Sequence, residues 1–384
     1  MWAVGRGGSP VSNLAVKVMT RTVERSSVET GTVTTLVPAW NEGKHIVITI
    51  KTLKAQIRPP DRIIVVADNC TDDTIERAKG AGTEILETVG NSDKKGGALN
   101  QALAALLPDA KDEDVFLIQD ADSTLAPHWL STALPLLQRS EIGAVGGIFY
   151  TPHHHNQGFI GELQRLEYVR YARQIARHNE RAYVLTGTAT ALRANVLREL
   201  ADAYTTGRLP GGTPGKLIYY VEASTSITED SFMTFAVKSL GYKTPSPMEC
   251  WVCTDVMGTW TELWAQRIRW QRGALENLRT FGVTRVTYPY ALRQLLTGGE
   301  MLALIMFAAI TIWSIAAGVF HIQPFWLGIS SVFIVERIVS VRKAGRRAML
   351  LAATMIPETL YGLWKHAVNI AGIYDIVTGS KTRW

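Results

Sequence analysis

The sequence predicts an α/β domain with a mostly parallel sheet flanked by helices, followed by a C-terminal part that associates with a membrane. Three observations support this class. Short β-branched and apolar runs alternate with helical segments between residues 32 and 119, acidic residues follow two of these runs, and the composition becomes strongly apolar after residue 297. Alternating strands and helices are typical of a parallel sheet that is covered on both faces.

The predicted strands and helices alternate in chain order. Strands are expected at 32–38, 62–67, 83–87 and 115–119. Helices are expected at 42–53, 71–79 and 97–107, and a Thr-Asp-Asp sequence caps the second of them. Asp68 and Asp120 each follow a strand. Because ligands of such sheets gather at the carboxyl ends of the strands, we expect one crevice to hold both side chains.

Motifs that are absent from the sequence argue against several classes of protein. Neither G-x-G-x-x-G nor G-x-x-x-x-G-K-[ST] occurs, which argues against dinucleotide enzymes and P-loop NTPases. The net charge is +6, and no Lys/Arg tract alternates with aromatic residues, so no nucleic-acid partner is expected. Attraction to anionic lipid head groups explains the excess of positive charge.

The cysteines and histidines do not predict a metal site. Three cysteines in 384 residues fit a reduced compartment. Cys250 and Cys253 form a C-x-x-C without a second pair, so we interpret 249–253 as a strand. His153–His155 are interpreted as a solvated turn, because consecutive residues rarely present three imidazoles to one metal.

Three apolar runs follow residue 297. The run 301–320 has no charged residue and is long enough to cross a bilayer, which needs about 20 apolar residues. The run 321–341 carries charges only near its far end, and the run 348–368 is interrupted by charges and by Pro357, which would kink a helix. We therefore expect two spans and a third segment that crosses, re-enters or lies in the interface. A helix hairpin in a soluble core is the alternative.

The segments between these runs predict an orientation. The turn around His321 has no Lys or Arg, whereas four of the six residues at 342–347 are Lys or Arg. The positive-inside bias places that loop and the domain before residue 297 in the cytoplasm, which predicts a multi-pass protein of the cell membrane. Residues 1–31 are interpreted as an N-terminal arm and not as a signal peptide, because their apolar part is short and contains Lys17.

Asp120 and Asp122 form a D-x-D at the end of a predicted buried strand. Carboxylate oxygens suit Mg²⁺ or Mn²⁺, and such a cation would offset the charge of a diphosphate leaving group. The alternative is that both aspartates cap the next helix. The strand at 115–118 favours the metal site, because it directs the pair toward the crevice.

Thr228–Asp230 precedes a predicted helix at 231–236. Asp230 could accept the proton of a sugar hydroxyl and so make that hydroxyl a nucleophile. The alternative is an acid at the helix N-terminus that interacts favourably with the helix dipole. Both interpretations can hold together, because the helix N-terminus keeps a carboxylate ionised.

Gln266–Trp270 combines two guanidinium groups with an indole. Arg267 and Arg269 are expected to clamp a diphosphate with forked hydrogen bonds, and Trp270 offers an apolar face to a pyranose ring. The alternative is a basic amphipathic helix on the membrane surface, since large apolar residues lie nearby at 260, 263 and 264.

Together these motifs resemble the membrane-bound, processive-type glycosyltransferase family 2, which includes cellulose, hyaluronan, chitin and poly-N-acetylglucosamine synthases. The resemblance covers about residues 32–275 and the character of the C-terminal helices. Trp40 stands where the pattern has Tyr, and Asn69 where it has a second Asp. The matching segments are Val37–Glu42, Asp68, Lys95–Asn100, Asp120–Asp122, Thr186–Arg193, Thr228–Asp230 and Gln266–Trp270.

The resemblance implies a GT-A-type nucleotide-sugar-binding domain at 32–257, amphipathic interface helices at 258–296 and a membrane domain of two to three transmembrane helices at 297–384. It implies inverting transfer from a UDP-sugar to a glycan or lipid-linked acceptor, with Asp230 as the catalytic base and Mg²⁺ or Mn²⁺ at Asp120 and Asp122. The nucleotide-sugar would be bound by Pro38, Ala39, Glu42, Asp68, Lys95, Asp120, Gln266, Arg267, Arg269 and Trp270.

The chain departs from this family in its small number of membrane spans. One subunit with so few spans lacks a complete polymer channel, so it either forms homo-oligomers or releases a short or lipid-linked product. Two alternatives remain: an enzyme that adds one sugar to a polyprenyl phosphate, and a non-catalytic sensor of nucleotide-sugars. Gln266–Trp270 argues against the first, and the intact D-x-D and Asp230 argue against the second.

Overall fold

The computed structural model describes residues 31–151, 158–212, 215–222 and 224–379. All of these residues belong to one compact unit that begins at Gly31. Apart from Gly31, the predicted N-terminal arm lies outside the described residues, and so do His153–His155.

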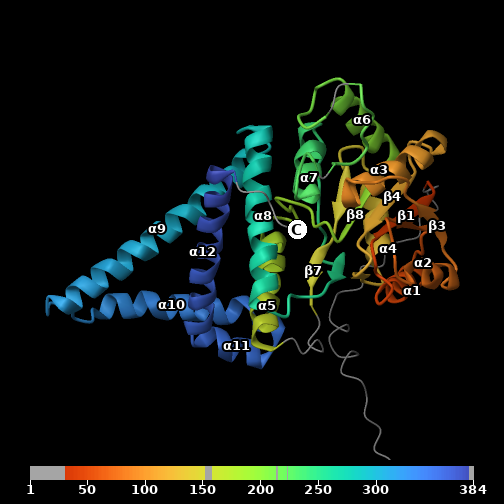
Figure 1. Ribbon diagram of the computed structural model, residues 1–384. Coiled ribbons are helices and arrows are strands. Elements are labelled where there is room, and N and C mark those ends of the chain that lie inside the picture. Colours follow the sequence, from red (N-terminus) through yellow and green to blue (C-terminus); the bar gives the residue numbers. More distant parts are fainter. Residues whose placement is uncertain (1–30, 152–157, 213–214, 223, 380–384) are drawn as a thin grey trace, which may run out of the picture. The chain divides into compact units, whose positions relative to one another are not determined.

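A six-stranded sheet forms the centre of the unit, with the strand order β3-β2-β1-β4-β8-β6 (Figure 1). Its strands are β1 Val33–Ala39, β2 Arg62–Ala67, β3 Glu84–Glu87, β4 Val115–Gln119, β6 Ala144–Gly146 and β8 Ala189–Arg193. β1 pairs in parallel with β2 and β4, and β2 pairs in parallel with β3. β8 runs antiparallel to β4 and β6. The predicted parallel strands are confirmed, and β8 makes the sheet mixed.

Helices cover both faces of this sheet because its strands are apolar on both sides. Val65 of β2 packs toward one face, among α1 Ile46–Lys54, α2 Thr74–Gly80 and α4 Trp129–Leu137. Its neighbour Val66 packs toward the other face, among α3 Lys94–Leu106, α6 Ala194–Thr205 and α7 Glu229–Ser239. The 3-10 helix η2, Leu107–Asp109, follows α3. Burial on both faces is the reason that these strands are continuously apolar.

A second, three-stranded sheet has the order β5-β9-β7. It consists of β5 Thr124–Leu125, β7 Ile148–Tyr150 and β9 Trp251–Cys253, and α5 Gly158–Arg177 packs on β7. The predicted strand at the C-x-x-C is confirmed as β9. Cys250 and Cys253 are free thiols, and burial raises the pKa of Cys253.

Helix α8, Trp260–Phe281, lies between the sheets and the C-terminal helices (Figure 1). A capping box starts it: the Thr259 hydroxyl accepts from the Glu262 amide, and the Glu262 carboxylate accepts from the Thr259 amide. Leu263 is fully buried against Leu163 and Tyr361. Part of the apolar face of α8 is therefore covered by protein, while Trp260 is exposed, and the interface helices at 258–296 stay a prediction.

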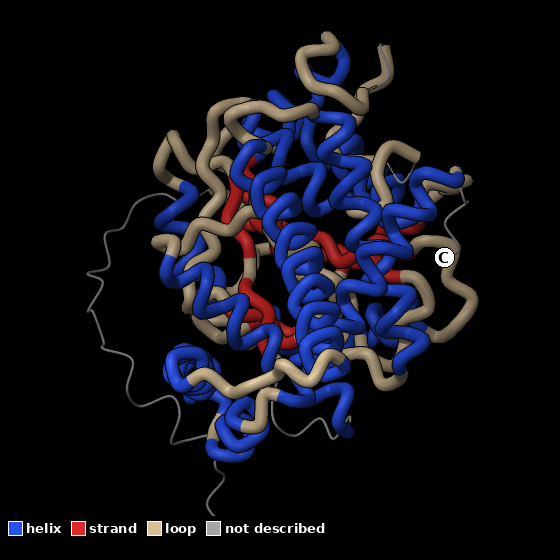
Figure 2. The backbone as a smooth tube through the Cα atoms, turned by 90° about the vertical axis from the view of Figure 1, so that its left-hand side faces the viewer, coloured by secondary structure: helices blue, strands red, loops and turns tan. Residues whose placement is uncertain are grey.

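The C-terminal part consists of helices that pack on α8 and α5 or extend from them, and Figure 2 shows them in front of the strands. They are α9 Tyr288–Ala316, α10 Pro324–Ser340, η3 Arg342–Ala344, α11 Arg346–Ala353 and α12 Ile356–Thr378. Among the described residues, only α9 is both long and apolar enough to cross a membrane. The predicted second span corresponds to α10, which has 17 residues.

The third apolar run does not form one helix. It breaks at Met355, which has a positive φ of 56°, and Pro357 lies in the first turn of the new helix α12. A proline at a helix start needs no amide partner, so it does not kink α12 as expected. Ala348, Ala352 and Val368 are buried, which shows that α11 and α12 pack against protein.

Gly273 allows α8 to approach the turn before α7. A Cβ atom at this position would overlap the Thr228 side chain. We expect Gly273→Ala to lower the unfolding free energy by about 1–3 kcal/mol through overpacking, measured as a lower Tm in detergent. Gly298→Ala is the matched control, because its Cβ would meet no atom within 4 Å. Equal Tm values for both variants would contradict this close packing.

Candidate active site

The carboxyl ends of β1, β2 and β4 meet at one edge of the central sheet, as predicted. Ala39 and Ala67 are register partners at the ends of β1 and β2. The Ala39 carbonyl accepts a hydrogen bond from the Asp68 amide at 2.9 Å. Pro38 and Ala39 thus lie beside Asp68, while Asp120 follows β4 two strands away.

The buried Asp68 carboxylate is held by three side chains. Its Oδ1 atom accepts from the Asn69 amide at 3.0 Å, the Thr88 hydroxyl at 2.8 Å and the Asn91 amide at 2.8 Å. No contact of Oδ2 is present among the described residues. Asn69, which departs from the family pattern, therefore helps to orient Asp68.

Three carboxylates gather at the end of β4. Burial, followed by repulsion from Asp122, raises the pKa of Glu42. Burial also raises the pKa of Asp120, to which Asp122 adds repulsion. Such crowding of oxygen ligands fits a divalent cation, which would relieve the repulsion. No group of three or more potential ligand side chains is assembled in the described part of the chain. A cation at this edge would thus be held by Asp120 and Asp122 together with oxygens of a substrate. Mg²⁺ is usually bound in this way, by one or two carboxylates and substrate oxygens.

Lys95 links this acidic edge to α7. Its Nζ atom donates to Asp120 at 2.6 Å and to the Gly187 carbonyl at 3.1 Å, and it lies 3.5 Å from the Glu229 carboxylate. Burial lowers the pKa of Lys95, but the carboxylates of Asp120 and Glu229 outweigh burial and hold it well above its usual value. Gly96 allows the start of α3 to lie against the chain at Val221, because a Cβ at position 96 would overlap the Val221 carbonyl.

Asp230 lies in the first turn of α7. Its Oδ1 accepts from the Ser231 amide at 2.7 Å. Burial, followed by repulsion from Glu229, raises the pKa of Asp230 to about 6. A carboxylate of this kind is ionised at neutral pH and is a stronger base than an exposed aspartate, as general-base catalysis requires.

The turn that carries Asp230 is fixed by Asn277 of α8, which the sequence analysis did not single out. The Asn277 amide donates to the Thr228 carbonyl at 3.2 Å and to the Thr228 hydroxyl at 3.1 Å, and its oxygen accepts from Ser226 at 2.8 Å. Asn277 is 1% exposed. The one sequence feature that points to Asn277 is its spacing from Gly273. The two residues are four apart in a helix and therefore lie on the same face of α8.

Glu229 and Asp230 belong to two different cavities. Glu229 lines a cavity of about 230 Å³, together with Lys94, Lys95, Gly96, Asp120, Val221, Ser226 and Arg269. Asp230 lines a larger cavity of about 610 Å³ between α5, α7, α8, α9 and α12. The start of α7 therefore forms a wall whose adjacent carboxylates face separate spaces. We call these spaces the small cavity and the large cavity.

The structure separates Arg267 from Arg269. Arg267 lines the large cavity and is paired with Glu167 at 2.9 Å, whereas Arg269 lines the small cavity with Asp120. Residues two apart on a helix point to different sides. The structure therefore places Arg269, and not Arg267, in the cavity that contains Asp120, and the clamp of one diphosphate by both arginines stays a prediction.

Trp270 and Gln266 are also oriented by their place on α8. The Arg267 guanidinium lies 4.3 Å from the Trp270 ring centroid, and Phe149 is nearly parallel to the indole at 6.4 Å. Trp270 is thus an element of the large cavity, not of the small one. The Gln266 Oε1 atom is buried without a hydrogen-bond partner in the described residues.

Glu167 of α5 is a further residue that the sequence analysis missed. It pairs with Arg267 at 2.9 Å and Lys365 at 3.4 Å, and it accepts from the Tyr361 hydroxyl at 2.9 Å. Although burial raises the pKa of Glu167, Arg267 and Lys365 lower it to about 2. This cluster joins α5, α8 and α12, which are far apart in the sequence, so no local pattern predicts it.

The family model described as "Glycosyltransferase like family 2" matches residues 31–273. The chain belongs to this family. No curated protein matches the chain in sequence.

Solved structures of glycosyltransferases share the fold. The chain is similar to a mannosyltransferase from Pyrobaculum calidifontis in complex with GDP-Man and Mn²⁺, with 19% identity, a TM-score of 0.58, and coverage of 91% of this chain and 88% of that one. This match shows a GT-A-like fold. Glucosyl-3-phosphoglycerate synthase from Mycobacterium tuberculosis in complex with Mn²⁺, UDP and phosphoglyceric acid matches at 20% identity and a TM-score of 0.41, covering 66% and 80% of the two chains. The same enzyme has been solved with Mg²⁺ and UDP.

The raised pKa of Asp230 predicts a change in stability. The pKa lies above the unfolded value, so the ionised carboxylate destabilises the fold as pH rises from about 4 through about 6. We expect Asp230→Asn to gain on the order of 1–3 kcal/mol of unfolding free energy near pH 8 and much less near pH 4. Thermal unfolding at both pH values measures this, with the exposed Asp109→Asn as control. A gain independent of pH would exclude this electrostatic cause.

Proposed function

We propose that the chain is an inverting, metal-dependent hexosyltransferase that moves a sugar from a UDP-sugar to a glycan or lipid-linked acceptor at the cytoplasmic face of the cell membrane. The observation that carries this proposal is the wall formed by Glu229 and Asp230 between the two cavities. The small cavity is assigned to the donor diphosphate and the large cavity to the acceptor. The acceptor hydroxyl and the anomeric carbon would then meet beside Asp230, where the two cavities come closest along α7.

In this mechanism Asp230 accepts the proton of the acceptor hydroxyl. The hydroxyl oxygen attacks the anomeric carbon, the bond from that carbon to the diphosphate oxygen breaks, and UDP leaves from the opposite side. Attack opposite the leaving group inverts the configuration. Because the pKa of Asp230 is about 6, the base is ionised at neutral pH and can still bind the proton it receives.

The donor diphosphate is assigned to the small cavity because cations converge there. Burial, followed by repulsion from Arg269, lowers the pKa of Lys94, so two positive groups lie close together. A diphosphate would relieve this repulsion. A divalent cation bound by Asp120 and Asp122 would add further positive charge beside the leaving group.

Asp68 favours uracil over guanine as the base of the donor. Its Oδ1 atom already accepts three hydrogen bonds, which leaves Oδ2 as the carboxylate oxygen available to the base. Uracil presents a single ring N–H between two carbonyl groups, whereas guanine presents two adjacent donors that need two acceptors.

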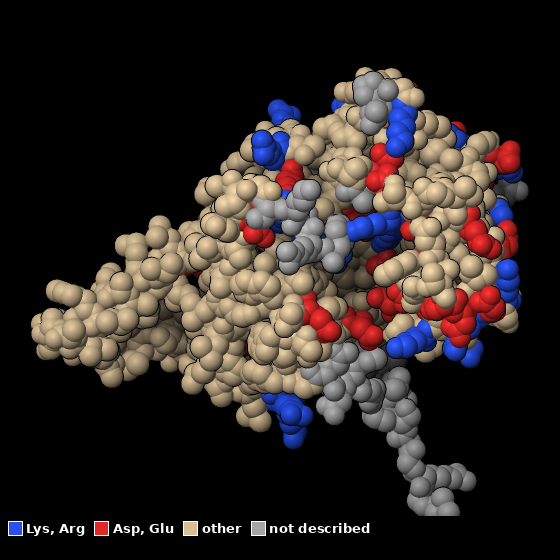
Figure 3. Space-filling model, in the orientation of Figure 1, with Lys and Arg blue, Asp and Glu red and all other residues tan. Residues whose placement is uncertain are grey.

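The membrane location is supported by α9 and α10. Residues 301–335 contain no Asp, Glu, Lys or Arg, and Figure 3 shows no charged side chain on the outer part of these helices on the face drawn. Phe307, Trp313 and Trp326 are more than 60% exposed. An apolar surface of this kind is unfavourable in water and favourable in a bilayer. We propose that α9 and α10 insert together, with the catalytic domain cytoplasmic.

We expect purified protein in detergent, with Mn²⁺ or Mg²⁺, to release UDP from one UDP-sugar of a panel. Asp230→Asn should lower this rate by about 10²–10⁴-fold, because the acceptor hydroxyl loses its base. The wild-type rate should rise with pH through about 6, as Asp230 ionises. The control Asp109→Asn should retain the wild-type rate. Equal UDP release by Asp230→Asn would contradict the assignment of Asp230 as the base. The length of the product distinguishes polysaccharide synthesis from a single transfer.

We expect the protein to bind UDP at least about tenfold more tightly than GDP, which corresponds to about 1.4 kcal/mol. Asp68→Asn should remove this preference, because an amide nitrogen would replace the oxygen that accepts from the base. Calorimetric titration with both nucleotides measures the preference. Equal or stronger binding of GDP by the wild-type protein would reject UDP as the donor nucleotide and leave the transferase mechanism intact.

A further inference from the structure

Two carboxylates hold most of the cationic side chains of the large cavity in ion pairs. Five Lys and Arg side chains line this cavity. Four of them form ion pairs: Arg267 and Lys365 with Glu167, and Arg170 and Arg337 with Glu358. These pairs join α5 to α8 and α12, and α10 to α12, and they have a structural role. Glu167 and Glu358 carry only two negative charges for these four cations, and the fifth side chain, Arg293 on α9, forms no ion pair with a described residue.

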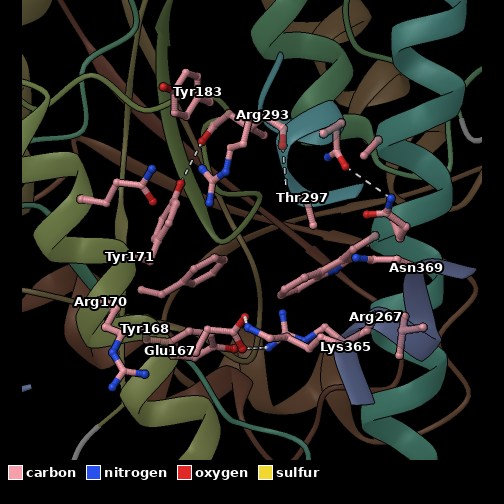
Figure 4. A pocket seen from close by; sticks show the side chains of 18 of the residues that line it. Glu167, Tyr168, Arg170, Tyr171, Tyr183, Arg267, Arg293, Thr297, Lys365 and Asn369 are labelled. Atoms are coloured by element: carbon pink, nitrogen blue, oxygen red, sulfur yellow. Dashed lines mark hydrogen bonds and ion pairs between the residues drawn. The ribbon is translucent and has the colours of Figure 1, made fainter. Parts of the chain in front are cut away.

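Arg293 has no carboxylate within ion-pair distance among the described residues, although it lines the same cavity. Its guanidinium lies 5.5 Å from the centre of the Tyr183 ring. Figure 4 shows Arg293 beside Tyr171 and Tyr183, on the opposite side of the cavity from Glu167 and Lys365. A guanidinium that is partly removed from water without an anion is costly.

Arg293 lies near the proposed base. Burial raises the pKa of Tyr171 to about 12, and Arg293 and Asp230 act on the same hydroxyl in opposite directions. Asp230 and Arg293 also lie close enough to Tyr290 for their charges to act on its hydroxyl in opposite directions. One side of the large cavity therefore combines the carboxylate that would receive a proton with a cation that is not ion-paired to any carboxylate of the described residues.

We propose that Arg293 binds an oxyanion, a phosphate or carboxylate, that the acceptor carries close to its reacting hydroxyl. This inference rests on the proposed function and names the class of its acceptor. An anionic acceptor beside the ionised Asp230 would be repelled, and a guanidinium at this position offsets that repulsion with forked hydrogen bonds. A neutral acceptor would leave the guanidinium without an anion.

The place of Arg293 in α9 connects the acceptor to the membrane. Arg293 precedes the uncharged stretch that starts at Met301 by two turns of the same helix. An oxyanion bound there would lie at the level where a lipid head group meets water. The same chemistry could also come from a soluble phosphate ester, so the experiment separates the two sources.

The test measures binding to full-length protein in detergent by calorimetry, with decyl phosphate, decanoate, glycerol 3-phosphate and the neutral decyl glucoside as probes. Arg293→Gln should weaken binding of the anionic probes by about tenfold or more and leave decyl glucoside unchanged. Arg293→Lys, which keeps the charge and loses the fork, should lie between. Arg285→Gln is the matched control, since Arg285 is exposed and does not line the cavity.

Two patterns would support the inference, and they differ in the source of the anion. If Arg293→Gln loses binding of decyl phosphate or decanoate, and glycerol 3-phosphate does not bind at all, the acceptor is a lipid. If Arg293→Gln loses binding of glycerol 3-phosphate to the same extent, the acceptor is soluble. Unchanged binding of every anionic probe by Arg293→Gln would overturn it. UDP binding, measured on the same samples, tests the donor site independently, so a failure of the proposed function is recognised separately.

Discussion

The contact between α8 and the start of α7 is the constraint on which the site depends. Gly273 brings the α8 backbone against Thr228, and Asn277 hydrogen-bonds the turn that carries Asp230. The other face of α8 packs on α12 and α5. The position of α8 against the C-terminal helices therefore fixes where the Asp230 carboxylate lies. A side chain of any size at position 273 would separate these elements.

The charges of the site follow from this arrangement. Lys95 holds Asp120 and approaches Glu229, so the small cavity contains a cation between two carboxylates. Asp230, one residue further on, faces the large cavity, and burial raises its pKa to about 6. Neighbouring carboxylates with different surroundings can perform different tasks, one in ion pairing and the other in proton transfer.

The C-terminal helices divide into two groups with different surroundings. α11 and α12 bury Ala352 and Val368 against the rest of the protein, whereas α9 has no buried residue. Because the large cavity is lined by residues of both α9 and α12, it lies between the sheet-bearing part and the helices that we assign to the membrane. An acceptor can therefore reach Asp230 from the membrane side in our proposal.

The sequence by itself determined the α/β class, the strands that end at Asp68 and Asp120, and the family, because each rests on local pattern: alternating burial, strand-ending acids and spaced motifs. The apolar runs likewise predicted α9 and α10. The tertiary structure decided which side of α8 each arginine occupies, that Met355 breaks the third run, and that Glu167, Asn277 and Arg293 belong to the site. These features arise from contacts between helices distant in sequence, where close packing and ion pairing override the local pattern.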